Sequence, residues 1–187
     1  MKMLELNQVL LEGERQTLSL MAFAGEVTTL TGDSAEHLSR WLAAVMGFST
    51  VLNGYISIDG EPLSSRSAPV FRRLMAYAPA RLVRLGEVKF YEPPTVQDIF
   101  GLQVNRELPI SNGILGEEMR KIGVDPSDER VQLIAVASLL NKPVLLIDNP
   151  PVGAMGYLRQ LAVKGRVVLL TSNEREVLAA SDKVVEV

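Results

Sequence analysis

Short apolar runs bounded by turn residues recur along the chain and predict β-strands. The predicted strands are Met3–Val9, Gln16–Ala22, Val27–Thr31, Tyr55–Ile58, Arg73–Ala78, Val144–Ile147, Val167–Thr171 and Lys183–Val187. Val144–Ile147 and Val167–Leu170 are uniformly apolar, which is typical of central parallel strands that are covered on both faces. They are therefore expected at the centre of a sheet.

Apolar residues at helical spacing fall between these strands. The predicted helices are Ala35–Met46, Thr95–Leu102, Gly116–Ile122, Glu129–Leu140, Met155–Val163 and Glu174–Ser181. Strand and helix alternate from residue 27 onward, which predicts a mainly parallel sheet flanked by helices. The first strands and Tyr55–Ile58 are expected to form a small antiparallel side sheet, so the fold class is α/β.

The 187 residues suit one domain that spans 1–187 and is long enough to bury a core. The stretch Arg81–Ile114 is the least periodic part and is rich in proline, glycine and charge. It predicts a long loop or small peripheral subdomain. We expect a reduced helical subdomain over approximately 80–130.

The net charge of −3 and the pI near 5.3 argue against a nucleic-acid partner, which normally requires clustered cations. With no cysteine and a single histidine, His37, disulfides and cysteine or histidine metal clusters are excluded. Residues 1–11 do not have the pattern of a signal peptide, and no run approaches the ~20 apolar residues of a membrane span. The sequence predicts a cytoplasmic protein that reaches the inner membrane only through a partner.

Several short segments occur in an order and spacing that, taken together, are informative. They are Met3-Leu-Glu-Leu-Asn7, Ala24-Gly-Glu-Val27, Thr31-Gly32, Gly54-Tyr-Ile-Ser-Ile-Asp-Gly60, Tyr77-Ala-Pro79, Thr95-Val-Gln-Asp-Ile99, Asn141-Lys-Pro-Val-Leu-Leu-Ile-Asp-Asn-Pro150 and Val167-Val-Leu-Leu-Thr-Ser172. Over nearly the whole chain this series resembles the ATP-binding domain of ABC transporters. The resemblance implies a P-loop NTPase fold.

The family's phosphate-binding loop, Gly-x-x-x-x-Gly-Lys-Ser/Thr, falls on Gly32–Ser39. Gly32 and Ser39 keep the first glycine and the hydroxyl, whereas His37 replaces the second glycine and Leu38 replaces the lysine. A P-loop wraps phosphates with backbone N–H groups and neutralises them with lysine. The resemblance therefore marks a vestigial nucleotide-binding loop, whose positions are Gly32, Ser34, His37, Leu38, Ser39 and Arg40.

The start of the helix after this loop has the spacing of a capping box, Asp33-Ser-Ala-Glu36. Side chains are then expected to occupy the N–H groups that would bind phosphate, and the two carboxylates would repel it. Arg40 is the alternative cation, although a solvent-exposed position is favoured for it.

Asp148 follows an apolar strand where the family has its Walker B aspartate, and the resemblance implies Mg²⁺ binding by Ser39 and Asp148. The alternative is that Asp148 caps the turn into Pro150. No catalytic residue is expected, because Asn149 stands in the position of the catalytic glutamate and an amide cannot accept a proton. Ser172 stands in the position of the switch histidine.

The family's remaining motifs are also changed. Asp125-Pro-Ser-Asp-Glu129 takes the place of the signature sequence and reads as a helix start with Asp125 as N-cap and Pro126 in the first turn. Ala80 stands in the Q-loop glutamine position and Met155 in the D-loop aspartate position. Near Leu11–Gly13 the chain has no aromatic residue to stack on adenine.

Three other features were considered for function. His37 is expected to be a solvated residue of the first helical turn, and Trp41 to pack in the core or an interface. A basic cluster of Arg72, Arg73, Arg81 and Arg84 lies where the family docks on membrane partners, and a solvated face is an equal alternative.

The leading hypothesis is a non-catalytic ABC ATP-binding-subunit-like protein, or pseudo-ATPase, for which no cofactor is expected. It would act as a scaffold or regulatory subunit and pair with another ABC-type subunit or with a membrane permease. One alternative is a divergent ATPase that uses Ser39, Arg40 and Asp148 with ATP and Mg²⁺. The other is a generic α/β domain that binds a different small molecule at its strand ends.

Overall fold

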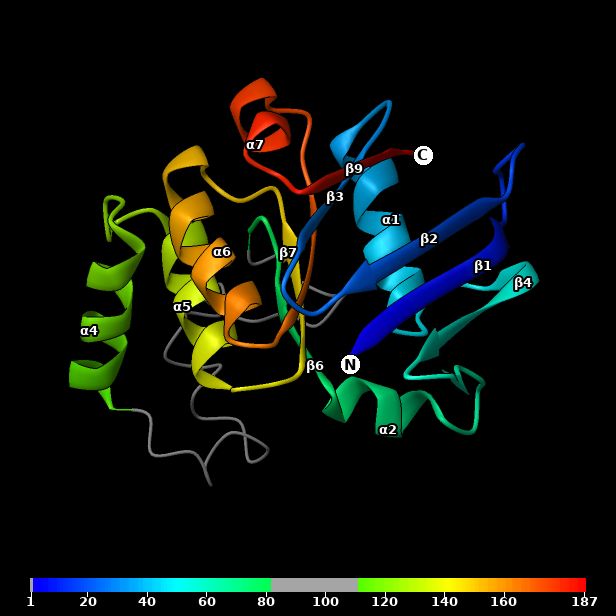
Figure 1. The fold of residues 1–187 in the computed structure, drawn as a ribbon, viewed down its shortest axis with the longest axis horizontal. Helices are drawn as coiled ribbons and strands as arrows, with labels where there is room; N and C mark the ends of the chain where they lie inside the picture. Colours follow the sequence, from blue (N-terminus) through cyan, green and yellow to red (C-terminus); the bar gives the residue numbers. More distant parts are fainter. Residues whose placement is uncertain (1, 82–110) are drawn as a thin grey trace, which may run out of the picture.

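The computed structural model describes residues 2–81 and 111–187, which form two β-sheets and the helices around them (Figure 1). The smaller sheet is antiparallel, with strand order β2-β1-β4-β5. Its strands are β1 (Met3–Leu11), β2 (Leu18–Phe23), β4 (Val51–Ile58) and β5 (Glu61–Pro62).

The larger sheet is parallel, with strand order β6-β7-β8-β3-β9. Its strands are β3 (Val27–Thr31), β6 (Met75–Ala78), β7 (Val144–Asp148), β8 (Val167–Thr171) and β9 (Lys183–Glu186). Every residue of β7 and β8 is buried, as expected for central strands with both faces covered.

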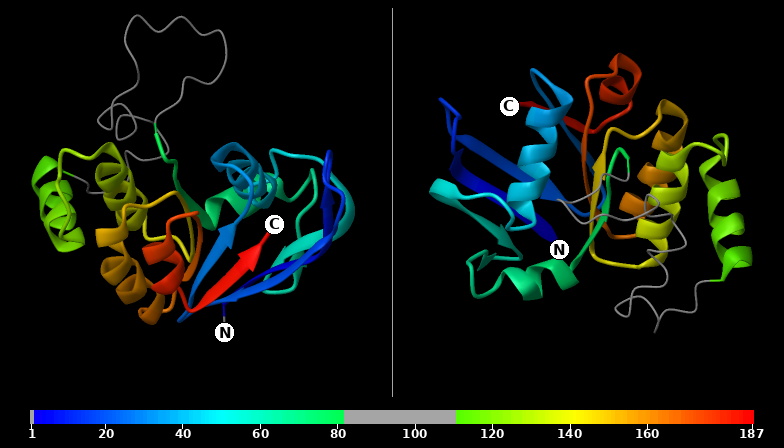
Figure 2. Two further views of the ribbon diagram at one scale, coloured as in Figure 1. Left: turned by 90° about the horizontal axis from the view of Figure 1, so that it is seen from above. Right: turned by 180° about the vertical axis from the view of Figure 1, so that it is seen from behind.

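Helices cover both faces of the parallel sheet (Figures 1 and 2). The helices are α1 (Ala35–Val45), α2 (Ala68–Arg73), α4 (Asn112–Ile122), α5 (Glu129–Leu139), α6 (Met155–Val163) and α7 (Arg175–Ala179), with a 3₁₀ turn at Val152–Ala154. Helix α1 lies between the two sheets, whereas α5 and α6 pack on the opposite face of the parallel sheet and α4 packs outside them.

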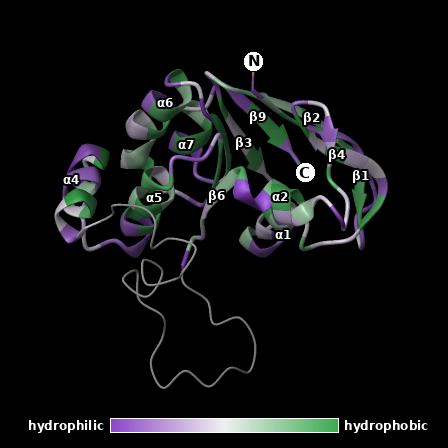
Figure 3. Ribbon diagram, turned by 90° about the horizontal axis from the view of Figure 1, so that it is seen from below, coloured by the Kyte–Doolittle hydropathy of each residue, from purple (hydrophilic) through white to green (hydrophobic). Residues whose placement is uncertain are grey.

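The parallel sheet separates two apolar cores. One core joins α1, the antiparallel sheet and one face of β7 and β8, and includes the buried residues Leu38 and Trp41. The other joins the opposite face to α5 and α6. Figure 3 shows that polar residues predominate on α4, the outermost helix. The two cores fix the strand ends that carry the candidate site.

The predicted α/β fold with a parallel sheet, flanking helices and an antiparallel side sheet is confirmed. The predicted helix Thr95–Leu102 and most of the expected subdomain over approximately 80–130 lie outside the described residues. Within that expected range the structure describes α4 and the start of α5.

Several elements differ from the prediction: β2 begins at Leu18 and not at Gln16, and α4 begins at Asn112 and not at Gly116. Strand β4 begins at Val51 and not at Tyr55, because Gly54 does not end the strand but sits in it with φ +77°. A Cβ at Gly54 would lie 2.2 Å from the carbonyl oxygen of Asn7, so glycine permits the close approach of β1 at an irregularity in the pairing. The short helix α2 was not predicted, and the strand expected from Arg73 begins at Met75.

Among the helices of the described residues, none combines the length and the apolar character that crossing a membrane requires.

Candidate functional site

The candidate site lies where the strands of the parallel sheet end. Helix α1 follows β3, Asp148 is the last residue of β7, and Thr171 is the last residue of β8. In a parallel sheet the carboxyl ends of neighbouring strands meet at one edge, which is the usual position of ligand sites in α/β folds.

The start of α1 is capped by its own chain. Ser34 is the N-cap residue, and its Oγ accepts a hydrogen bond from the backbone N–H of His37 at 3.1 Å. The expectation that Asp33 caps this helix is therefore wrong by one residue. Its consequence stands, because a side chain occupies one of the N–H groups of the first helical turn.

Leu38, in the position of the family's lysine, packs into the core. Its side chain is 2 % exposed and belongs to the apolar cluster around α1. A Cβ at Gly32 would lie 2.7 Å from the carbonyl oxygen of Val187, so the glycine allows the chain after β9 to approach the loop. Both positions are thus explained by packing within the protein.

Asp148 is buried and accepts hydrogen bonds from side chains of neighbouring elements. Its Oδ1 lies 2.7 Å from the Thr171 hydroxyl, and its Oδ2 lies 2.6 Å from the Ser39 hydroxyl. Ser39 Oγ also lies 2.9 Å from the Ala35 carbonyl oxygen, but the carboxylate is the closer and stronger acceptor. The hydrogen bonds of Asp148 thus run to α1 and β8, and the Asn149 N–H of the following turn donates to the Thr171 carbonyl oxygen.

Tyr77 on β6 lies near Asp148. Burial and the negative charge of Asp148 raise the pKa of Tyr77 well above its usual range. The hydroxyl groups of Ser39 and Thr171 thus satisfy the buried carboxylate of Asp148 with hydrogen bonds.

Ser39 and Asp148 meet as the resemblance implies, and both offer oxygen atoms of the kind that Mg²⁺ prefers. The described residues contain no group of three or more histidine, aspartate or glutamate side chains that could hold a metal ion. Protein atoms would thus supply few of the ligands, so this pair fits Mg²⁺ only together with a bound phosphate.

Asn173, two residues after β8, closes the loop between β3 and α1. Its Oδ1 accepts hydrogen bonds from the Thr31 hydroxyl at 2.7 Å and from the Gly32 N–H at 3.1 Å. Its Nδ2 donates to the Gly32 carbonyl oxygen at 2.8 Å. One amide side chain therefore satisfies both backbone polar groups of Gly32. We call this set of three hydrogen bonds the Asn173 clamp.

The sequence analysis did not identify the Asn173 clamp. The available signal was a short polar residue just after a buried strand, at the edge where β3 also ends.

Asn149 and Ser172, which stand in the positions of the catalytic glutamate and the switch histidine, both border the site. Asn149 adopts a left-handed conformation with φ 49°, which asparagine tolerates better than most residues. The buried Ser172 accepts a hydrogen bond from the Glu174 N–H through its Oγ. Neither side chain carries a group that accepts a proton readily.

His37 does not lie in solvent as expected. Its side chain is only 15 % exposed, with Nε2 2.9 Å from the Glu14 carboxylate and 3.3 Å from Nε1 of Trp41. Trp41 is buried, which confirms its predicted packing. Arg40 donates to the Glu12 carbonyl oxygen and lies 3.8 Å from Glu14. Both side chains point to the β1–β2 turn, so Arg40 would have to leave these contacts to reach a phosphate beside Asp148.

Two hollows flank Asp148. Among the described residues, the β7–β8 pocket, of about 500 Å³, is lined by Asp148, Glu174 and Glu176 and by a single cation, Arg175. The α1–β6 pocket, of about 720 Å³, is lined by Glu36 and Asp148 and, in the described part of the chain, by one cation, Arg81. Ala80, in the Q-loop position, lines the second pocket. In both described linings carboxylates outnumber guanidinium groups, which disfavours an anion.

The segment in the signature position also needs a correction. The N-cap of α5 is Asp128, whose Oδ1 accepts from the Arg130 N–H, and not Asp125. Asp125 accepts from the Ser127 N–H in the preceding turn, so Pro126 lies before the helix. Met155, in the D-loop position, is buried at the start of α6.

The chain is similar to known proteins in sequence and in fold. An aliphatic sulfonates import ATP-binding protein of Agrobacterium fabrum is 29 % identical over 90 % of this chain and 68 % of its own length. No protein-family model matches the chain.

Solved structures extend this likeness at the level of the fold. The ATP-binding subunit of an ABC transporter matches 99 % of this chain and 85 % of its own with a TM-score of 0.73 at 19 % identity. An ABC transporter ATP-binding protein from Pyrococcus furiosus matches 98 % of this chain and 96 % of its own with a TM-score of 0.73 at 11 % identity. An ATP-binding cassette dimer bound to ADP and phosphate matches 98 % and 94 % with a TM-score of 0.72 at 16 % identity. In sequence the chain is similar to an ABC import ATP-binding protein, and its fold is that of ABC transporter ATP-binding domains.

Proposed function

We propose that this chain is a non-hydrolysing ABC-type domain that serves as a scaffold or regulatory subunit of a transporter-like assembly. The observation that carries the proposal is the burial of Leu38 in the lysine position, where the family needs a cation for the phosphates. An apolar side chain packed in the core cannot neutralise a triphosphate.

The surroundings of Leu38 support the same conclusion. Arg40 is engaged at the β1–β2 turn, and the pockets beside Asp148 carry more carboxylates than cations. Phosphoryl transfer depends on positioned positive charge and Mg²⁺ for most of its rate enhancement. A polyphosphate in this site would face net repulsion.

Internal hydrogen bonds also fill the places that a nucleotide and Mg²⁺ would take. Ser39 and Thr171 donate to Asp148, Ser34 caps α1, and the Asn173 clamp holds Gly32. Asn149 offers an amide where a carboxylate would orient and deprotonate the attacking water. A retained fold without this chemistry is suited to protein contacts.

The role in a transporter-like assembly is supported by the import ATP-binding protein that this chain resembles. The expected partners are another ABC-type subunit or a membrane permease. These partners would bind this chain in a conformation that does not depend on ATP.

Phosphate release from Mg-ATP by the whole chain tests the proposal. We expect the wild-type chain and Asp148→Asn to give the same rate as buffer, with Asn53→Ala as a surface control and circular dichroism to confirm folding. Turnover that is present in the wild-type chain and in Asn53→Ala, but lost in Asp148→Asn, would overturn the proposal.

A further inference from the structure

The outer edge of the antiparallel sheet is open along half of β4. Strand β4 pairs with β1 on one side, whereas on the other side β5 pairs only with Ser57 and Ile58. Within the described residues, Val51–Tyr55 therefore has no strand neighbour on its outer side. An open edge presents backbone N–H and C=O groups that can pair with another strand.

This edge lacks the features that normally protect an edge strand. Residues 41–58 contain no charged residue and no proline. By contrast, the edge strand β9 carries Lys183 and Glu186, and Lys183 Nζ donates to the Met21 carbonyl oxygen on the edge strand β2. Charge, especially lysine, is a common guard against strand addition. The edge of β4 is therefore suited to pairing.

A groove of about 450 Å³ runs beside this edge. One wall is β4, and the other is the segment 63–68 that leads into α2. All the residues that line it are uncharged, and most are small, such as Gly47, Ser49 and Ser64. Val51, Ile56 and Leu63 in the lining are apolar, so the groove can accept an extended chain and offers apolar contacts to its side chains. Outside the lining, Leu52 on the strand is 59 % exposed and Phe48, which precedes the strand, is 66 % exposed.

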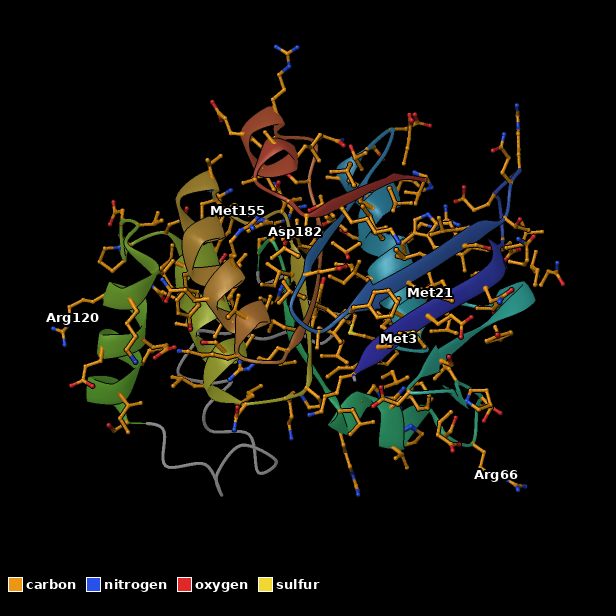
Figure 4. The ribbon with its side chains drawn as sticks, viewed as in Figure 1. Met3, Met21, Arg66, Arg120, Met155 and Asp182 are labelled. Carbon is orange, nitrogen blue, oxygen red and sulfur yellow. The ribbon has the colours of Figure 1, made fainter. Side chains whose placement is uncertain are left out.

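Cations stand next to the groove. The guanidinium of Arg72 lies 4.8 Å from the centre of the Phe48 ring, and Arg66 is exposed on the far wall and extends away from the protein (Figure 4). Arg73 is exposed on α2. None of these three arginines forms an ion pair with a described residue. This charge favours carboxylates in the occupant.

We propose that the open edge of β4 binds an extended, acidic segment of a partner protein, which adds a strand to the antiparallel sheet. A second copy of this chain fits less well, because the free edge is only five residues long and a stable interface needs roughly 1,200 Å². A single strand in the groove contacts both β4 and the 63–68 wall. The site is separate from Asp148, so it does not depend on whether the chain hydrolyses ATP.

Fluorescence anisotropy with the whole chain tests the proposal. The probe is a labelled peptide of about nine residues that alternates valine and threonine between glutamate ends. Its matched control has lysine ends. We expect the glutamate peptide to bind about tenfold more tightly than the lysine peptide.

Backbone pairing is tested with two further glutamate peptides, N-methylated at alternate residues in opposite registers. Only one side of a strand faces the edge of β4, so we expect one of these peptides to keep binding and the other to lose it.

Substitutions in the protein test where the peptide binds. Leu52→Asp should abolish binding, and Arg66→Glu should remove the preference for glutamate. Val163→Asp should change nothing, because Val163 is an exposed apolar residue of α6, a helix that lies across the molecule from β4 (Figure 1).

The proposal is overturned if no peptide binds at about 1 mM, if the lysine peptide binds equally well, or if Leu52→Asp has no effect. It is also overturned if sedimentation shows a dimer that Leu52→Asp converts to a monomer, since the occupant would then be a second copy.

Discussion

The loop between β3 and α1 and the outer edge of β4 differ in how their backbone polar groups are used. At the loop, Asn173 bonds both polar groups of Gly32, and Ser34 caps the first turn of α1. At the edge, Val51–Tyr55 has no strand on its outer side within the described chain. The backbone polar groups of Gly32 are thus paired within the protein, whereas the outer side of β4 keeps free pairing capacity.

Electrostatics sharpen this contrast. Among the described residues, carboxylates outnumber cations around Asp148, whereas arginines without a described ion pair flank the uncharged groove beside β4. An acidic ligand is thus disfavoured at the first region and favoured at the second. This contrast is what the proposed non-hydrolysing function and the proposed peptide site both rest on.

Truncation of one leucine in each region should give the largest difference in the free energy of unfolding. Leu38→Ala is expected to lower the free energy of unfolding by about 3 kcal/mol, because it leaves a cavity in the core around α1. Leu52→Ala, at an exposed side chain, should change it by less than about 0.5 kcal/mol. Urea denaturation followed by circular dichroism measures both. A loss below about 1 kcal/mol for Leu38→Ala would show that this side chain is not a core residue.

A matched pair of asparagine substitutions, one in each region, should give a smaller difference in the free energy of unfolding. Asn173→Ala is expected to cost about 1–2 kcal/mol, because it removes the Asn173 clamp. Asn53→Ala, on the open edge of β4, should stay within about 0.5 kcal/mol. Hydrogen exchange at the Gly32 amide gives a second readout and should speed up only in Asn173→Ala. Unchanged exchange there would contradict the clamp.

The sequence predicted the buried elements well. Val167–Thr171 has the bounds expected of it, because a strand covered on both faces leaves a continuous apolar run. Val27–Thr31 also has its predicted bounds, although three of its five residues are threonines. The helix Met155–Val163 also has its predicted bounds. Short surface elements were harder to predict. Helix α2 contains only six residues with a proline near its start, so no periodic pattern identifies it.

The candidate site was predicted in part. The resemblance predicted that Ser39 and Asp148 lie close together, and they do. This was predictable because the strand before each of them is readily recognised in the sequence. The partners of His37 and Asn173 were not predictable. Both side chains bond to residues far away in the sequence, Glu14 and Gly32, and no local pattern encodes such pairs.

Isothermal titration of the whole chain with Mg-ATP is the most direct test of the claim that the loop is closed to nucleotide. We predict no binding heat for ATP up to about 1 mM, because Leu38 supplies no charge and internal hydrogen bonds occupy Gly32 and Asp148. Binding at about micromolar strength that is lost in Asp148→Asn would contradict this account.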